Sequence, residues 1–295
     1  MKVAVLDIGG TFIKYGYMLD EQLITCGKMK TPNNMDSLWK TLDDIWDCVH
    51  EDVEGLAISM PGVIDSIKGH AYNAGSLLYF KECNFAQMLS KRYGVSVWIG
   101  NDAKCAGIAE VGYGVLQGVQ DAIVVILGTG IGGCIIKDGN IHYGSHFSAG
   151  EVSFLQVNID AYDQVDNWWC NVNGNQALLQ YVQHHLHTNQ TYSGEEIFEM
   201  ANKGNPAVLK ALRQFCMKLA VQLFNMQCIL DAQVIAIGGG ISAQPLLLEV
   251  IRECYKEVTD KFPYPIFVPN IEVCQYRNEA NMLGAYYEWK KMYQK

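Results

Sequence analysis

The fold is decided by an N-terminal stretch that reads Val3-Ala4-Val5-Leu6-Asp7-Ile8-Gly9-Gly10-Thr11-Phe12-Ile13-Lys14-Tyr15-Gly16-Tyr17. An apolar strand ends on Asp7, the chain turns through Gly9, Gly10 and Thr11, and an alternating strand follows. Because no helical pattern follows the glycines, the stretch is neither a P-loop nor a dinucleotide-binding motif. Such a tip offers backbone N–H groups and a hydroxyl to phosphate, and its strand-end carboxylate can hold Mg2+ through water. An ordinary glycine turn explains this tip alone equally well.

A second copy of the pattern reads Ile123-Val124-Val125-Ile126-Leu127-Gly128-Thr129-Gly130-Ile131-Gly132-Gly133-Cys134-Ile135-Ile136-Lys137-Asp138-Gly139. The copies lie too far apart for a solenoid, whose repeats recur every roughly 20–50 residues. They predict two related domains whose hairpin tips face each other. A third glycine stretch, Val234-Ile235-Ala236-Ile237-Gly238-Gly239-Gly240-Ile241-Ser242, predicts a buried strand that ends where a flat ligand group can lie against bare backbone.

Together these stretches resemble the actin/hexokinase/Hsp70 superfamily of ATP-dependent phosphotransferases, and within it the ROK family of sugar kinases. The resemblance covers nearly the whole chain and implies an α/β fold of two actin-like (ribonuclease H-like) domains with a ligand cleft between them. Its motifs occur in the family's order and at its spacing: Asp7-Ile8-Gly9-Gly10-Thr11, Met60-Pro61-Gly62-Val63-Ile64-Asp65, Asn101-Asp102-Ala103, Leu127-Gly128-Thr129-Gly130-Ile131-Gly132-Gly133, Ala149-Gly150-Glu151 and Ile237-Gly238-Gly239-Gly240-Ile241-Ser242.

We expect an N-terminal α/β domain over 1–117, a larger α/β domain over 118–277, and a C-terminal segment, 278–295, whose helix packs back on the first domain. The segment 160–174 has no clear periodicity and is predicted to be a loop. Expected strands lie near 2–7, 11–19, 22–29, 54–59, 95–99, 121–128, 132–137, 140–142, 233–237 and 265–268. Expected helices lie near 35–50, 84–93, 102–114, 175–186, 193–202, 205–230, 243–260 and 278–292.

Composition agrees with a cytoplasmic enzyme. A chain of 295 residues with 49% hydrophobic content buries a core large enough for two domains. The net charge of −9 argues against nucleic acid as a partner, and no apolar run is long enough to span a bilayer. Ten cysteines without CxxC pairs indicate reduced thiols. We expect a homodimer with a small-molecule sugar substrate and no membrane partner; the family's repressors carry a helix-turn-helix before the first hairpin, which this sequence does not show.

The catalytic residues are expected where a strand meets a helix, at Asn101 and Asp102. By resemblance Asp102 is the base that accepts the proton of the sugar 6-hydroxyl, and Asn101 hydrogen-bonds neighbouring hydroxyls. A plain helix cap would look the same in isolation. The resemblance also implies ATP with Mg2+, the metal being held by Asp7 through water. The implied nucleotide-binding residues are Asp7, Gly9, Gly10, Thr11, Lys14, Gly128, Thr129, Gly130, Gly132, Gly238, Gly239 and Gly240.

Sugar contacts are implied for Glu151 and for Asn73. A surface carboxylate is the alternative for Glu151. The resemblance is weaker at Asn73, because Tyr72 stands where the family has a proline. Lys14 is assigned to charge stabilisation, with a solvated strand residue as its alternative.

The family's zinc site is replaced. A histidine and three cysteines bind zinc in the family, and the aligned positions here carry Phe154, Asn171, Asn173 and Leu178. Asn and Leu supply no thiolate, so we expect no zinc. Gln180 stands where the family has a glutamate.

The family histidine and glutamate contact the anomeric end of the sugar, so Phe154 and Gln180 leave room there for an O1 substituent. Trp168 and Trp169 either add stacking surface or fill the space that zinc would organise. The sequence thus predicts an ATP-dependent kinase for the 6-hydroxyl of a hexose or β-glucoside. A kinase for free glucose or N-acetylmannosamine, and a catalytically idle sugar-binding or regulatory protein, remain alternatives; an actin- or Hsp70-like ATPase is disfavoured by Asn101, Asp102 and Glu151.

Overall fold

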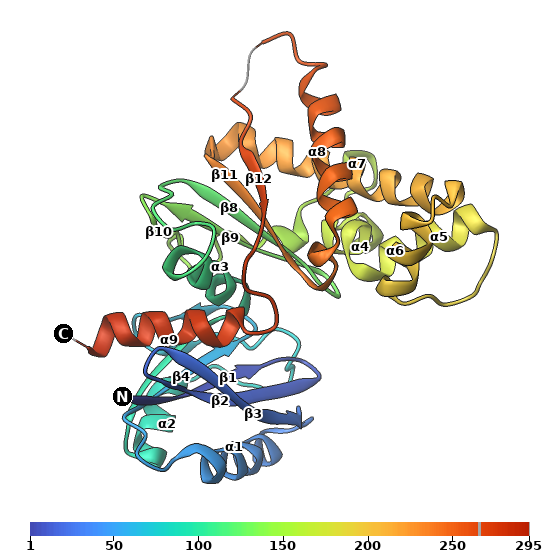
Figure 1. Cartoon of the computed structure of the whole chain (residues 1–295). Coiled ribbons are helices and arrows are strands. Elements are labelled where there is room, and N and C mark those ends of the chain that lie inside the picture. Colours follow the sequence, from blue (N-terminus) through green and yellow to red (C-terminus); the bar gives the residue numbers. More distant parts are fainter. Residues whose placement is uncertain (265–266, 295) are drawn as a thin grey trace. The chain divides into compact units, whose positions relative to one another are not determined.

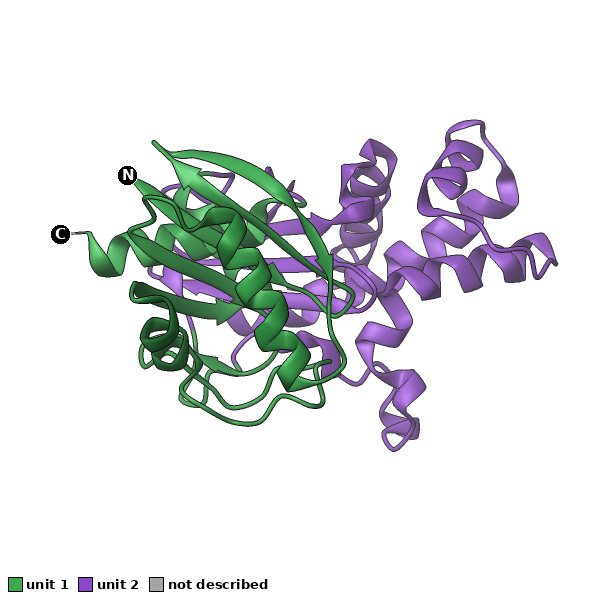
Figure 2. Ribbon diagram, turned by 90° about the horizontal axis from the view of Figure 1, so that it is seen from below, with its two compact units in different colours: residues 1–113, 143–148, 278–295 green, residues 114–142, 149–277 purple. Residues whose placement is uncertain are grey.

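The computed structural model describes residues 1–264 and 267–294. These residues form two compact units, coloured separately in Figure 2. Unit 1 comprises Met1–Tyr113, Tyr143–Ser148 and Asn278–Lys295, and unit 2 comprises Gly114–His142 and Ala149–Arg277. The short segment 143–148 therefore belongs to unit 1, although it lies between two segments of unit 2.

Unit 1 is built on a five-stranded sheet with the order β3-β2-β1-β4-β7. The first three strands are antiparallel, and β4 and β7 continue the sheet in parallel with β1. The strands are β1 Lys2–Ile8, β2 Phe12–Leu19, β3 Gln22–Lys30, β4 Gly55–Met60 and β7 Ser96–Asn101, with a small hairpin of β5 Ile64–Asp65 and β6 His70–Ala71. The helices are α1 Met35–Val49, α2 Phe85–Tyr93, α3 Asp102–Gly112 and α9 Ala280–Tyr293.

Helices cover both faces of this sheet, as Figure 1 shows for α9 on one side and α1 on the other. Helix α1 starts at a cap where Asn34 accepts a hydrogen bond from the Ser37 N–H at 2.9 Å. Its buried residues Leu38, Leu42, Ile45 and Val49 recur at helical spacing and join the core below β1 and β4. Helix α9 packs against α3 and β4 within the same unit.

Unit 2 repeats the sheet with the order β10-β9-β8-β11-β12, again with three antiparallel strands followed by two parallel ones. Its strands are β8 Ala122–Leu127, β9 Ile131–Lys137, β10 Asn140–Ile141, β11 Val234–Gly239 and β12 Asn270–Val273. Its α-helices are α4 Trp169–Asn173, α5 Asn175–Leu186, α6 Gly194–Asn202, α7 Pro206–Leu230 and α8 Pro245–Thr259, and the short 3-10 turns are η1 Val152–Phe154, η2 Ile159–Ala161, η3 Val165–Asn167 and η4 Gly240–Ala243.

Two predicted elements were wrong. The strand expected over 265–268 is absent at 267–268, while 265–266 lie outside the described residues; β12 begins instead at Asn270, which pairs with Val234 of β11. The position of β12 is set by its pairing with β11, a strand that is distant in sequence. The loop expected over 160–174 contains η3 and α4, because the buried indole of Trp169 anchors it to the core.

Among the described residues, no helix is both long and apolar enough to cross a membrane.

Candidate functional site

The hairpin tip of unit 1 is held by a threonine from the end of β3. Thr31 donates its N–H to the Thr11 carbonyl at 2.9 Å and its hydroxyl to the Gly9 carbonyl at 2.6 Å. The Gly9 N–H bonds across the turn to the carbonyl of Phe12 at 3.0 Å. Gly10 and Thr11 are exposed at the tip. Thr31 therefore holds the turn through hydrogen bonds to Gly9 and Thr11, while Gly10 and Thr11 are exposed to solvent and available to a ligand.

Behind this tip, the buried carboxylate of Asp7 is surrounded by donors. Its Oδ1 accepts the Ser59 hydroxyl at 3.2 Å and the Asn281 side-chain amide at 2.9 Å. Its Oδ2 lies 3.6 Å from Nζ of Lys14, which also donates to the Asn278 carbonyl at 3.4 Å. One carboxylate oxygen is thus fixed by neutral donors, and the other faces a cation.

At the start of α3, Asn101 positions the neighbouring Asp102. The Asn101 Oδ1 caps the helix by accepting the Lys104 N–H at 3.0 Å, and its Nδ2 donates to the Gly62 carbonyl at 3.0 Å and to Asp102 Oδ1 at 3.1 Å. Asp102 Oδ1 also accepts the Ala103 N–H at 2.8 Å. The cap interpretation therefore holds for Asn101, whose amide also orients the Asp102 carboxylate.

The pKa of the buried Cys105 thiol is affected by both carboxylates, Asp102 and Asp7. Burial raises the pKa of Cys105 well above its usual value, and the charges of Asp102 and Asp7 raise it further, while a hydrogen bond with Ser59 lowers it. Asp7 and Asp102 therefore belong to one electrostatic environment within unit 1. That environment disfavours a thiolate, so Cys105 stays neutral.

Asn73 shapes the neighbouring loop. Its Oδ1 accepts the N–H groups of Val63 at 3.3 Å and of Gly75 at 3.1 Å. Gly62 has a φ of +104°, and a Cβ there would meet the Asn73 carbonyl at 2.3 Å, so only glycine fits. Asn73 itself is exposed. Its amide oxygen holds the loop that receives the Asn101 amide at Gly62.

The hairpin tip of unit 2 is closed by backbone hydrogen bonds. The Gly128 N–H bonds to the Gly130 carbonyl at 3.0 Å, and the Gly128 carbonyl accepts the N–H of Asn175, the first residue of α5, at 2.9 Å. Thr129 is exposed between them. Gly132 follows in β9, opposite Ile126. Helix α5 therefore begins directly beside this tip.

The third glycine stretch divides into a packed part and an open part. A Cβ on Gly238 would lie 2.6 Å from Ile126, and one on Gly239, whose φ is +96°, would lie 2.0 Å from the Leu127 carbonyl. A Cβ on Gly240 would meet nothing within 4 Å. The first two glycines are required by the contact with β8, and Gly240 leaves space for a ligand.

The positions that align with the zinc ligands have other roles. Asn173 is buried, accepts the Trp169 indole N–H at 2.9 Å and donates to the Phe215 carbonyl at 2.8 Å. Leu178 is buried in the same core. Phe154 is 59% exposed, and its ring lies nearly perpendicular to that of Trp168, with 5.3 Å between the ring centroids. Trp169 therefore fills the interior, whereas Phe154 and Trp168 keep aromatic surface on the outside.

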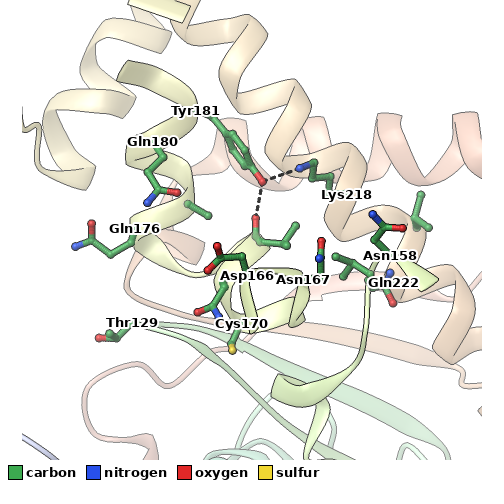
Figure 3. Close-up of a pocket in the computed structure, with 15 residues that line it drawn as sticks. Thr129, Asn158, Asp166, Asn167, Cys170, Gln176, Gln180, Tyr181, Lys218 and Gln222 are labelled. Atoms are coloured by element: carbon green, nitrogen blue, oxygen red, sulfur yellow. Dashed lines mark hydrogen bonds between the residues drawn. The ribbon is translucent and has the colours of Figure 1, made fainter. Parts of the chain in front are cut away.

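A pocket of about 920 Å³ lies within unit 2 between α5, α7 and the loop that precedes α4. Gln180 and Thr129 line it, whereas Glu151 and Phe154 are not among its lining residues. Figure 3 shows Gln176 and Gln180 on one side of it and Lys218 on the other. The structure thus gathers one predicted nucleotide residue and one predicted sugar residue at the same pocket.

Glu151 lies in the turn that leads into η1, half-buried and next to Gly150. The hydroxyl of the following Ser153 bonds to the Ile131 carbonyl, which ties this turn to β9 just after the tip. Of the predicted residues, Asp7, Lys14, Asn73, Asn101 and Asp102 thus lie in unit 1, and Glu151, Phe154 and Gln180 lie in unit 2. Sequence reasoning missed Thr31, Ser59 and Asn281, none of which carries a local motif.

Two sheets of the same strand order, each with a glycine hairpin at one end, are typical of an α/β protein built from two actin-like domains. The model of the ROK family matches residues 3–292, and the chain belongs to this family. A β-glucoside kinase of Klebsiella pneumoniae is 29% identical, over 99% of this chain and 97% of its own. An N-acetyl-D-glucosamine kinase of Photobacterium profundum is 27% identical, over 95% of this chain and 96% of its own.

A solved structure is similar over its whole length. The crystal structure of a ROK family protein from Streptococcus pneumoniae in complex with sucrose has a TM-score of 0.87, is 28% identical and covers 99% of both chains. The predictions of the family, of an α/β fold with actin-like domains and of an ATP-dependent carbohydrate kinase are confirmed by these matches.

Proposed function

We propose that this protein transfers the γ-phosphoryl group of ATP to the 6-hydroxyl of a β-glucoside, with Asp102 as the general base. The observation that carries the proposal is the arrangement at the start of α3, where Asn101 and the Ala103 N–H both hold Oδ1 of Asp102. A carboxylate fixed in this way accepts the proton of a hydroxyl as that hydroxyl attacks phosphorus.

The surroundings of Asp7 fit a hydrated Mg2+, which is typically bound through one or two carboxylates together with phosphate oxygens. When bound, this ion supplies positive charge to the nucleotide phosphates. Ser59 and Asn281 hold Oδ1 of Asp7, so Oδ2 is the oxygen that would hold a hydrated ion. Lys14, 3.6 Å from Oδ2, is a second source of positive charge for the transferred group.

The acceptor is proposed to be O1-substituted. The relatives named β-glucoside kinase support this, and so do Phe154 and Gln180, which present an exposed ring and an amide where the family has a histidine and a glutamate. Glu151, Asn101 and Asn73 are the proposed partners of the remaining sugar hydroxyls.

A homodimer in the cytoplasm stays a prediction. For a homodimer, sedimentation should give a molecular mass of about twice the 32.9 kDa of one chain.

The test is ADP release with ATP and a panel of acceptors: glucose, N-acetylglucosamine, N-acetylmannosamine, cellobiose and aryl β-glucosides. We expect the greatest turnover with a β-glucoside and, by NMR, a product phosphorylated at C6. If the protein binds sugar but releases ADP with none of these acceptors, it is a catalytically idle sugar-binding protein.

A further inference from the structure

Apart from Thr129 and Gln180, the residues that line the pocket between α5 and α7 belong to none of the predicted sites, and the lining is mostly amides and hydroxyls. It contains one lysine and one carboxylate, Lys218 and Asp166, so it carries no excess of positive charge. Lys218 already donates to the Tyr181 hydroxyl at 3.0 Å and lies over the Tyr181 ring. Because the charge of Lys218 is balanced by that of Asp166 in the same lining, the pocket favours a neutral polar ligand over a phosphate or another anion.

Part of the polar lining builds the wall. Asn167 donates to the Ala161 carbonyl at 3.0 Å, Asn171 donates to the Val165 carbonyl at 2.7 Å, and the Tyr181 hydroxyl donates to the Val172 carbonyl at 2.9 Å. These bonds hold the loop before α4 in place. The donors of Asn167, Asn171 and Tyr181 in these bonds are therefore occupied by backbone carbonyls.

The other polar groups are available to a ligand. Within residues 1–264 and 267–294, the side chains of Asp166, Gln176 and Gln180 make no hydrogen bond to another residue. Gln176 and Gln180 are one helical turn apart on α5 and project on one side of the pocket in Figure 3, with Asp166 between α5 and α7. Amide and carboxylate groups of this kind pair with the vicinal hydroxyls of a sugar, and the Tyr181 ring and Val221 supply apolar surface.

We propose that this pocket is the subsite for the O1 substituent of the acceptor, and that the substituent is a second sugar ring. The inference rests on the proposed function, because Gln180 lines the pocket and stands where the family has its glutamate contact with the anomeric end. A volume of about 920 Å³ exceeds the need of one ring and lies within the range of pockets for drug-sized ligands. Gln176 and Asp166 bind hydroxyls of the second ring, and Gln180 lies at the linkage.

The experiment compares kcat/KM for cellobiose with kcat/KM for glucose, in the wild type and in the variants Gln176→Ala and Asp166→Asn. Gln176→Ala removes a hydrogen bond to the second ring, and Asp166→Asn replaces a charged acceptor of that ring by an amide, so we expect the cellobiose-to-glucose ratio to fall about five- to tenfold in each variant. The matched control is Gln183→Ala on α5, whose amide bonds to the Gln190 carbonyl at 2.9 Å and is not part of the pocket. The ratio of the control should equal that of the wild type.

An unchanged ratio in both pocket variants overturns the subsite, and so does an equal fall in the control. If the wild type phosphorylates no sugar, the proposed function fails, and calorimetry with cellobiose alone then decides the subsite. Binding weakened by Gln176→Ala but not by Gln183→Ala supports a disaccharide pocket without catalysis. Equal cellobiose binding by all variants overturns it.

Discussion

The two units have the same strand order but different chemistry at their hairpin tips. Two residue pairs below the tip, unit 1 places Asp7 opposite Lys14, whereas unit 2 places Ile126 opposite Gly132. The first tip has a side-chain hydrogen bond, from the Thr31 hydroxyl, in addition to its backbone bonds, whereas the bonds shown for the second tip, including that from Asn175, join backbone groups. One strand pattern therefore supports a charged site in one unit and a neutral one in the other.

This difference suggests that unit 1 carries the chemistry of phosphoryl transfer and that unit 2 selects the acceptor. The proposed base and the metal-facing carboxylate, Asp102 and Asp7, both lie in unit 1. The residues that replace the family's anomeric contacts, Phe154 and Gln180, lie in unit 2 with the amide-lined pocket. Substitutions in unit 1 should therefore lower turnover or phosphate binding, and substitutions in unit 2 should change which acceptor is preferred.

The largest effect is expected for Asp102→Asn. The amide keeps the shape of the side chain but accepts no proton, so kcat should fall by about 10²–10⁴ while sugar affinity stays within a few-fold. Turnover and calorimetric sugar binding measure the two quantities. The control is Asp36→Asn, which alters a carboxylate in the first turn of α1 and should leave kcat unchanged. Turnover of the Asp102 variant within tenfold of wild type would remove Asp102 from the mechanism.

The second prediction concerns unit 2 and the acceptor. With Phe154 exposed and Gln180 at the pocket, a β-glucoside should have a kcat/KM roughly tenfold to a hundredfold above that of glucose. The double change Phe154→His with Gln180→Glu should move the preference back toward free sugar. Preference of the wild type for glucose or N-acetylmannosamine over every glucoside would refute the open anomeric end, although the kinase assignment would survive.

A third, smaller effect separates positioning from folding in unit 1. Asn281→Ala deletes a 2.9 Å hydrogen bond to Oδ1 of Asp7 and leaves Ser59 as the remaining neutral donor there. Since hydrogen bonds to charged groups contribute about 1.5–3 kcal/mol, the Mg2+ concentration for half-maximal activity should rise by roughly tenfold. Calorimetry of Mg2+·ATP binding gives a readout independent of turnover. Met292→Ala, exposed on the same helix, is the control; a lower melting temperature with an unchanged Mg2+ requirement would mean that Asn281 acts only in folding.

Local sequence patterns predicted the hairpins and most helices because each carries its own signal. The bounds of α5, Asn175–Leu186, match the expected helix, and the cap of α3 at Asn101 follows from its residue type. The residues that hydrogen-bond to Gly9 and Asp7 from distant parts of the chain could not be predicted from local patterns. Thr31 reaches Gly9 across 22 positions, and Asn281 reaches Asp7 across 274.

The same limit explains the segment around α4. Its sequence has no helical period, yet Trp169 is buried and bonds to Asn173, which in turn bonds to Phe215 of α7. The order of this segment comes from a contact with a distant helix. The sequence predicts that the family's zinc ligands are replaced, but it does not predict the interactions of Trp169 with Asn173 and of Asn173 with Phe215.

The last prediction expects the smallest effect, and it tests that replacement. Because Trp169, Asn173 and Leu178 are buried, and Asn173 and Leu178 stand at two positions predicted to replace zinc ligands, a chelator should leave the melting temperature unchanged. The same chelator should abolish activity by removing Mg2+, and added Mg2+ should restore it. Elemental analysis of the purified protein should show no stoichiometric zinc. About one zinc per chain, together with a lower melting temperature in chelator, would mean that other side chains have rebuilt the site, and the contrast between a metal-dependent unit 1 and a metal-free unit 2 would then be lost.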